Sequence, residues 1–268
     1  MRIAMCQKDI RGDFRESLEW MAASSFDGVQ VWKRHMDDAG LTAPEVKTMA
    51  DDLGLVITAV GGGPNLVDPA TSAEVIDHFR RFLDLSVELG SGIVTAESKA
   101  KPAGLTDEAA WESTGATVSA ICAHAAEVGA VLAIECAGPC FIADHDDWHE
   151  LARRVRSGSL RVNFDPANIV WAGRDPVEAV QSLGAHIVHT HAKDIVFTSA
   201  QGNDGQPGVQ DVPAGEGECD YPAYLAALAE TGYRGFLTVE MHPGPGDGRA
   251  RALQAAHNLR GMLETVTA

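Results

Sequence analysis

The residues with the clearest chemistry are two histidines on one face of a predicted strand. In the stretch IVHTHAKD (187–194), His189 and His191 stand two apart within an apolar run. Successive side chains of a strand point to opposite faces, so residues two apart share a face. The pair is therefore either a set of hydrogen-bonded core residues or part of a binding site. The choice depends on which groups the fold places beside it.

Three carboxylates occupy comparable positions at the ends of other apolar runs. Glu135 follows AVLAI, Asp165 follows RVNF, and Glu240 follows LTV. Carboxylates that converge in a buried place cannot all stay ionised without a compensating cation. Together with an imidazole of His191 they form a hard, oxygen-rich donor set that suits Mn²⁺ or Mg²⁺ and also accepts Co²⁺ or Zn²⁺. Asp165 taken alone, before Pro166, is equally typical of a helix cap.

The elements that carry these residues alternate between strand-like and helix-like patterns. Such alternation predicts parallel strands joined by right-handed crossovers. Eight units in 268 residues match an α/β fold of the (β/α)8 TIM barrel type. We therefore expect one TIM barrel domain over residues 1–268, with its active site at the carboxyl ends of the strands. The strand-like runs are residues 2–6, 28–32, 55–60, 92–98, 130–136, 160–165, 186–191 and 235–241.

Two helical patterns and one loop give more local predictions. The segment 42–54 has Thr42 and Glu45 at the spacing of a capping box. The segment 197–220 is polar and rich in glycine, and we expect a long irregular loop of the kind that covers binding sites. The segment 73–90 is expected to bury one helical stripe, made of Val75, Ile76, Phe79, Phe82, Leu83 and Val87.

Composition limits the partners. The net charge of −17 disfavours nucleic acid and anionic membranes, so we expect a small-molecule partner. No apolar run is long enough for a transmembrane helix, and the first residues do not form a secretory signal. The five cysteines form no CxxC pair and are expected to be free thiols. These features predict a cytoplasmic protein.

The chain resembles the xylose isomerase-like TIM barrels, a family of sugar isomerases and epimerases. The resemblance implies that Glu135, Asp165, His191 and Glu240 bind a catalytic divalent ion, with Mn²⁺ expected first. It also implies that Glu135 and Glu240 do acid–base work and that the protein forms a homodimer or homotetramer. Besides Glu135 it rests on the motifs NFDPAN (163–168), HTHAKD (189–194), GEGECDYPAYLAAL (215–228) and GYRGFLTVEMH (232–242).

The activity implied by this resemblance is isomerisation or epimerisation of a sugar or keto-sugar. Such an enzyme removes the proton beside a carbonyl and passes through a metal-stabilised enediolate. The alternative is a lyase with the same first step, of the inosose dehydratase type or cleaving a 3-keto-glycoside. Two residue positions keep the lyase alternative open. Asn168 stands where many ketose 3-epimerases have His, and Phe197 stands where they have Arg.

Several other residues are candidates for contact with the substrate. Asn168 can donate and accept hydrogen bonds to substrate oxygens. Lys193 either does the same or pairs with a carboxylate such as Glu216. Glu97 either binds substrate hydroxyls or pairs with Lys99 or Lys101.

Three more aromatic or imidazole side chains, and one deeper histidine, complete the predicted site. Trp32 either forms an apolar wall for the C–H face of a sugar or simply packs. His35 and His242 stand just beyond strand ends, where they either reach the site or face solvent. His189, one layer below His191, is expected to be a hydrogen-bonded interior residue that supports the ligands.

Overall fold

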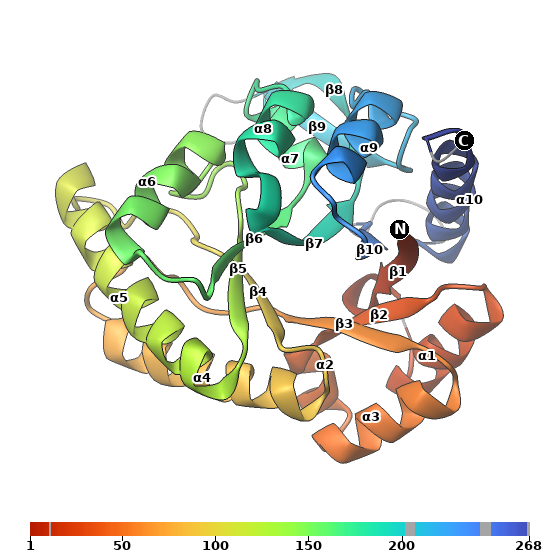
Figure 1. Ribbon diagram of the computed structural model, residues 1–268, viewed down its shortest axis with the longest axis horizontal. Coiled ribbons are helices and arrows are strands. Elements are labelled where there is room, and N and C mark those ends of the chain that lie inside the picture. The colour runs from red at the N-terminus through yellow and green to blue at the C-terminus, as the bar shows by residue number, and fades with distance from the viewer. Residues whose placement is uncertain (11, 202–206, 242–247, 267–268) are drawn as a thin grey trace.

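Eight parallel strands close into a barrel in the computed structural model, which describes residues 1–10, 12–201, 207–241 and 248–266 (Figure 1). The predicted (β/α)8 architecture is therefore confirmed, and the strand limits differ from the expected ones by at most two residues. Around the barrel the order is β1, β10, β7, β6, β5, β4, β3, β2. These strands are β1 (Arg2–Cys6), β2 (Gly28–Trp32), β3 (Val56–Gly61), β4 (Ile93–Glu97), β5 (Val131–Glu135), β6 (Leu160–Phe164), β7 (Ile187–Ala192) and β10 (Phe236–Val239).

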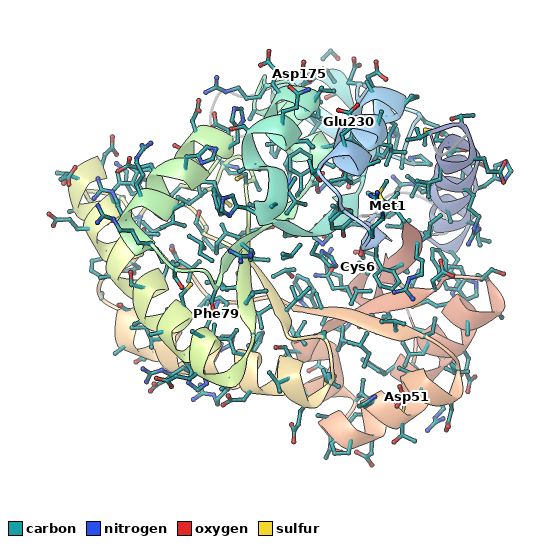
Figure 2. All side chains as sticks on the ribbon, viewed as in Figure 1. Met1, Cys6, Asp51, Phe79, Asp175 and Glu230 are labelled. Carbon is teal, nitrogen blue, oxygen red and sulfur yellow. The ribbon has the colours of Figure 1, made fainter. Side chains whose placement is uncertain are left out.

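Helices surround the barrel on its outside (Figure 1). Figure 2 shows the result for single side chains: Phe79 lies inside, fully buried, whereas Asp51 lies at the outer surface. None of the described helices combines the length and the apolar character needed to cross a membrane. The helices are α1 (Phe14–Ala23), α2 (Lys33–Asp38), α3 (Ala43–Asp52), α4 (Ser72–Glu88), α5 (Asp107–Val128), α6 (His145–Val155), α7 (Pro166–Trp171), α8 (Pro176–Leu183), α9 (Tyr221–Glu230) and α10 (Gly248–Val266), with short 3₁₀ turns at Gln7–Asp9 and Gly184–His186.

The local predictions for helices are confirmed in all but one position. Thr42 and Glu45 form the expected capping box at the start of α3, where the Glu45 carboxylate accepts from the Thr42 backbone N–H at 2.8 Å. On α4 most of the predicted stripe is buried, but Val87 is 43% exposed. The prediction for Val87 was wrong because the helix turns about 100° per residue. Twelve residues beyond Val75, the side chain has rotated about 120° away from the buried face.

The segment after β7 is more regular than its composition indicates. Strands β8 (Asp194–Gln201) and β9 (Pro207–Val212) pair as an antiparallel hairpin, so the prediction of an irregular loop from residue 197 was wrong over these ranges. Phe197 pairs with Val209 in this hairpin and is 44% exposed. A two-stranded hairpin outside the main core needs no strict alternation of apolar residues, so its pattern was hard to recognise.

Asp194 holds the base of this hairpin in place. Its buried carboxylate accepts hydrogen bonds from the backbone N–H groups of Ile195, Gly215, Gly217 and Cys219 at 2.8–3.1 Å. A Cβ on Gly217 would lie 2.3 Å from the Ile195 carbonyl oxygen, so only glycine permits this close approach. The chain therefore folds tightly around Asp194, and the adjacent Lys193 is fixed in position.

Replacing Asp194 with Ala is expected to lower the free energy of unfolding by at least about 3 kcal/mol, because four backbone N–H groups, two of them buried, lose their acceptor. Urea unfolding followed by circular dichroism measures this change. Asp220→Ala is the matched control: Asp220 is exposed and caps α9 through one bond, from Ala223 N–H, so its loss is expected to cost about 1 kcal/mol. Equal costs for the two variants would contradict the anchoring role of Asp194.

Candidate metal centre

Four side chains from four strands meet at the carboxyl end of the barrel. Glu135 ends β5, Asp165 follows β6, His191 lies in β7, and Glu240 follows β10. One ligand atom of each lies within 4.8 Å of those of the other three, and all four residues are buried. The strand ends thus bring together the set that the sequence predicts.

The two carboxylate oxygens of Asp165 have different surroundings. Oδ1 accepts from the backbone N–H groups of Ala167 (2.9 Å) and Asn168 (3.4 Å) and so caps α7. Oδ2 is buried and accepts no well-directed hydrogen bond from the described residues, although the Lys193 ammonium lies 2.9 Å away as an ion pair. One oxygen of Asp165 therefore caps a helix, while the other faces the cluster and is free to serve as a ligand.

The imidazole of His191 is oriented by Gln30. The Gln30 amide nitrogen donates to Thr95 Oγ1 at 2.7 Å, which turns its oxygen toward His191 Nε2 at 2.8 Å. His191 Nε2–H therefore donates to Gln30, and Nδ1 faces Glu135 Oε2 (3.1 Å) and Glu240 Oε2 (3.4 Å). Burial lowers the pKa of His191, but the charges of Glu240 and Glu135 outweigh burial and raise it to about 9.

Glu135 is held by two amide groups. Asn163 donates to its Oε2 and Asn168 to its Oε1, both at 2.8 Å. Burial, helped by the nearby His191, lowers the pKa of His189 well below its usual value, so His189 is neutral. Its Nδ1–H donates to Asn163 Oδ1 at 2.8 Å, and its Nε2 lies 3.1 Å from Thr238 Oγ1. His189 is thus a buried, hydrogen-bonded residue whose contacts reach Glu135 through Asn163.

Glu240 lies between two ammonium groups. Lys8 Nζ is 3.0 Å from its Oε1, and Lys193 Nζ is 3.0 Å from its Oε2. Lys8 also pairs with Asp9 at 2.9 Å, and Asp9 in turn accepts from the Met241 backbone N–H. Lys193 therefore pairs with carboxylates, as one prediction had it, but with Glu240 and Asp165 instead of Glu216.

The donor set fits a hard divalent ion. Three carboxylate oxygens and His191 Nδ1 can converge on one ion, and Asp165 Oδ2 is a buried anionic oxygen without a directed donor. Together with Asp9, the cluster holds four carboxylates against two ammonium groups. A divalent cation would neutralise the remaining negative charge. In the metal-free protein, a protonated His191 offsets part of that negative charge.

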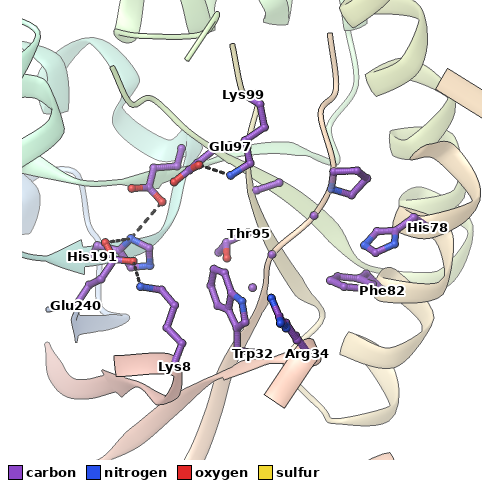
Figure 3. Close-up of a pocket in the computed structure, with 16 residues that line it drawn as sticks. Lys8, Trp32, Arg34, His78, Phe82, Thr95, Glu97, Lys99, His191 and Glu240 are labelled. Atoms are coloured by element: carbon purple, nitrogen blue, oxygen red, sulfur yellow. Dashed lines mark hydrogen bonds and ion pairs between the residues drawn. The ribbon is translucent and has the colours of Figure 1, made fainter. Parts of the chain in front are cut away.

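A cavity of about 480 Å³ opens directly from the cluster (Figure 3). Trp32 and Glu97, two of the predicted substrate contacts, line it. Glu97 also forms the expected ion pair with Lys99, at 2.5 Å. Lys99 is a non-glycine residue at φ 66°, a strained conformation that clusters at functional sites.

The other predicted substrate contacts lie elsewhere. Asn168 and Lys193 are buried against the carboxylates and are not part of the cavity wall. His35 lines a neighbouring cavity of about 500 Å³, where its Nδ1 is 2.9 Å from Gln7 Oε1. His242 falls outside the described residues.

Sequence reasoning missed three residues that complete the centre: Gln30, Asn163 and Lys8. Gln30 and Asn163 are wholly buried amides within apolar strands. A buried amide requires hydrogen-bond partners, which is the signal that points to them. Lys8 lies in the first strand-end turn and carries no comparable signal.

A family model for the xylose isomerase-like TIM barrel matches residues 18–264. The chain belongs to this family. The solved xylose isomerase domain protein from Alicyclobacillus acidocaldarius subsp. acidocaldarius superimposes with a TM-score of 0.84 at 17% identity, covering 100% of both chains. At this identity the likeness concerns the fold.

Two relatives with named functions are similar to this chain in sequence. The rhizopine catabolism protein MocC of Rhizobium meliloti is 31% identical over 144 residues, which are 50% of this chain and 44% of that protein. A 3-dehydroshikimate dehydratase of Pseudomonas putida is 24% identical over 273 residues, 98% of this chain and 41% of that protein. The chain thus spans less than half the length of these relatives.

The Gln30→Leu variant is expected to bind Mn²⁺ about 10- to 100-fold more weakly, because His191 loses the partner that points Nδ1 at the carboxylates. Isothermal titration calorimetry with the metal-free protein measures the affinity. Gln7→Leu is the control, since Gln7 is equally buried but contacts Ser17 and His35 instead of the cluster. An unchanged affinity in Gln30→Leu would refute the orienting role of Gln30.

The raised pKa of His191 predicts how the stability of the metal-free protein depends on pH. The pKa rises from 6.5 to about 9 on folding, so the stabilising proton is fully present below pH 6.5 and is lost as pH rises through 9. Across this window the metal-free protein should lose at most about 1.4 kcal/mol per pH unit. Differential scanning calorimetry at several pH values tests this.

Saturating Mn²⁺ should remove this pH dependence, because the metal ion replaces the proton on Nδ1. The His191→Gln variant should likewise show a flat profile in the same window without added metal. A wild-type profile with the same slope with and without Mn²⁺ would exclude His191 as a ligand.

Proposed function

We propose that this chain removes the proton next to the carbonyl of a sugar or keto-sugar, with a divalent ion, Mn²⁺ first, held by Glu135, Asp165, His191 and Glu240. The observation that carries the proposal is the position of two glutamates at the inner end of one cavity. Glu135 and Glu240 both line it, beside His191. Two carboxylates placed beside one substrate site can each accept or return a proton.

The bound ion and the chain's own residues would together prepare this reaction in three ways. The ion, when bound, supplies Lewis-acid stabilisation of negative charge on the substrate oxygens. Asn163 and Asn168 hold the two oxygens of Glu135 in place, and Lys8 and Lys193 do so for Glu240. Burial of these partners limits the movement of the carboxylates and the access of water to them.

The first candidate is an isomerase or epimerase. An epimerase needs one group to take the proton from carbon and another to return one to the opposite face. Glu135 and Glu240 come from strands on different parts of the barrel wall and reach the same cavity. An isomerase needs only one of them to carry the proton between adjacent carbons.

The second candidate is a lyase with the same first step, and two observations favour it. The relative from Pseudomonas putida is named a 3-dehydroshikimate dehydratase, and the match between the two covers 98% of the present chain. In addition, Asn168 donates to Glu135 and Phe197 lies on β8 outside the cavity wall. The two positions that hold substrate oxygens in the ketose 3-epimerases therefore do not reach the cavity. In a lyase the electron pair left on carbon expels a leaving group from the next carbon.

Proton exchange in D₂O tests the proposal and separates the candidates. The Mn²⁺-loaded protein is incubated with ketoses, inososes and 3-keto-glycosides, and the products are followed by NMR. Deuterium in an isomer identifies an isomerase or epimerase, whereas loss of water or of an aglycone identifies a lyase. Absence of exchange with every compound would count against the proposal.

Substitution of the two glutamates gives the matching prediction. Glu135→Gln and Glu240→Gln should each lower the exchange rate by roughly 10²- to 10⁴-fold, the usual contribution of a positioned acid or base. Glu216→Gln is the control, because Glu216 binds Asn258 away from the cluster. Retention of full exchange by either cluster variant would remove that glutamate from the mechanism.

The expected homodimer or homotetramer stays a prediction.

A further inference from the structure

The cavity continues well beyond the metal centre. In Figure 3, Glu240, His191 and Lys8 lie at one end, while His78 and Phe82 lie at the other, with Trp32 between them. Its volume of about 480 Å³ falls within the range of roughly 300–1,000 Å³ that encloses drug-sized ligands, which have more atoms than one sugar ring. A sugar held at the centre would leave the end beside α4 unfilled.

Three consecutive glycines, Gly61, Gly62 and Gly63, line this space. A Cβ on Gly61 would lie 2.3 Å from the Trp32 ring, and one on Gly63 would lie 2.3 Å from the Phe79 ring. The rings therefore occupy the positions that side chains would need, and the backbone of residues 61–63 forms part of the wall. The sequence VGGG (60–63) at the end of β3 thus lets the Trp32 and Phe79 rings pack closely against the backbone of this wall.

The end beside α4 has an aromatic surface. His78 and Phe82 are one helical turn apart, with ring centroids 4.2 Å from each other. Partial burial, together with the positive charges of Arg81 and Lys33, lowers the pKa of His78, so its ring is neutral. Among the described residues that line this end, the charged group is Arg34, whose exposed side chain lies 3.8 Å from Asp38.

The two ends therefore suit different chemistry. The end at the metal centre offers carboxylates, ammonium groups and the Glu97–Lys99 pair to substrate hydroxyls. Among the described residues that line the other end, Arg34 and His78 carry the polar groups, and His78 Nε2 is buried without a hydrogen-bond partner there, so the several hydroxyls of a second sugar would find few partners. An aromatic ring would instead stack on Phe82 and His78 and accept the guanidinium of Arg34 on its face.

We propose that the end of the cavity lined by His78, Phe82 and Arg34 is a subsite for an aromatic aglycone, so that the substrate class is aryl keto-glycosides. This inference rests on the proposed function for the keto-sugar part, which would occupy the metal centre. It applies whether the enzyme epimerises the sugar or expels the aglycone, because both need the aglycone bound.

Binding of unreactive glycosides tests the subsite separately from the reaction. Phenyl β-D-glucopyranoside and methyl β-D-glucopyranoside both lack the ketone and differ in the aglycone alone. With the Mn²⁺-loaded protein, calorimetry should show the phenyl glycoside binding at least about tenfold more tightly. Equal affinities would overturn the inference, and so would cellobiose binding as tightly as the phenyl glycoside, which would identify a second sugar subsite.

A pair of variants on α4 places the aryl group in the cavity. Phe82→Leu keeps an apolar side chain of similar size but loses the ring, and it should reduce the preference for phenyl over methyl to less than about threefold. Ile76→Leu, on the same helix but outside the cavity wall, should leave the preference intact. A preference that survives in Phe82→Leu would contradict the assignment.

The result can be told apart from failure of the proposed function. A phenyl preference without any proton exchange from the corresponding 3-keto-glycosides keeps the subsite and rejects the reaction. Exchange from 3-keto-glucose without a phenyl preference keeps the reaction and rejects the subsite.

Discussion

The site depends on one electrostatic constraint: several carboxylates are buried together and need positive charge. Glu135, Asp165, Glu240 and His191 converge so that one ligand atom of each lies within 4.8 Å of the others, and Asp9 lies behind Lys8. Such an arrangement is stable only with fixed cations and donors around it. Lys8 and Lys193 supply two charges, and His191 responds with a pKa of about 9. The same deficit of positive charge makes the cluster a good site for a divalent ion.

Three groups in the centre are oriented through the atom that does not face the cluster. Asp165 caps α7 with Oδ1, His191 donates from Nε2 to Gln30, and Asn163 accepts from His189 while it donates to Glu135. Each partner comes from a different strand or helix of the barrel, so the rigidity of the fold is transmitted to the ligand atoms. This arrangement meets the requirement of preorganisation, since the groups need not rearrange when charge develops.

The barrel and the four candidate ligands could be predicted because they follow from regular rules. Strand–helix alternation predicts a parallel barrel, and the barrel predicts that strand ends meet. The orienting amides could not be predicted with the same ease, because Gln30 and its partner His191 are 161 residues apart. A single buried amide in an apolar strand does not reveal which distant group it serves. The hairpin β8–β9 was missed for a related reason, since backbone pairing with few buried side chains leaves little trace in composition.

Neighbouring residues in the HTHAKD motif show how stability and chemistry share one short segment. Lys193 points into the cluster, where it pairs with Asp165 and Glu240, while Asp194 accepts four backbone N–H groups from the chain around it. Tyr221 also donates to the Lys193 carbonyl oxygen. A long lysine side chain would lose rotamer entropy at this site, and that cost is smaller when its backbone is already immobile. The structural role of Asp194 therefore makes possible the electrostatic role of Lys193.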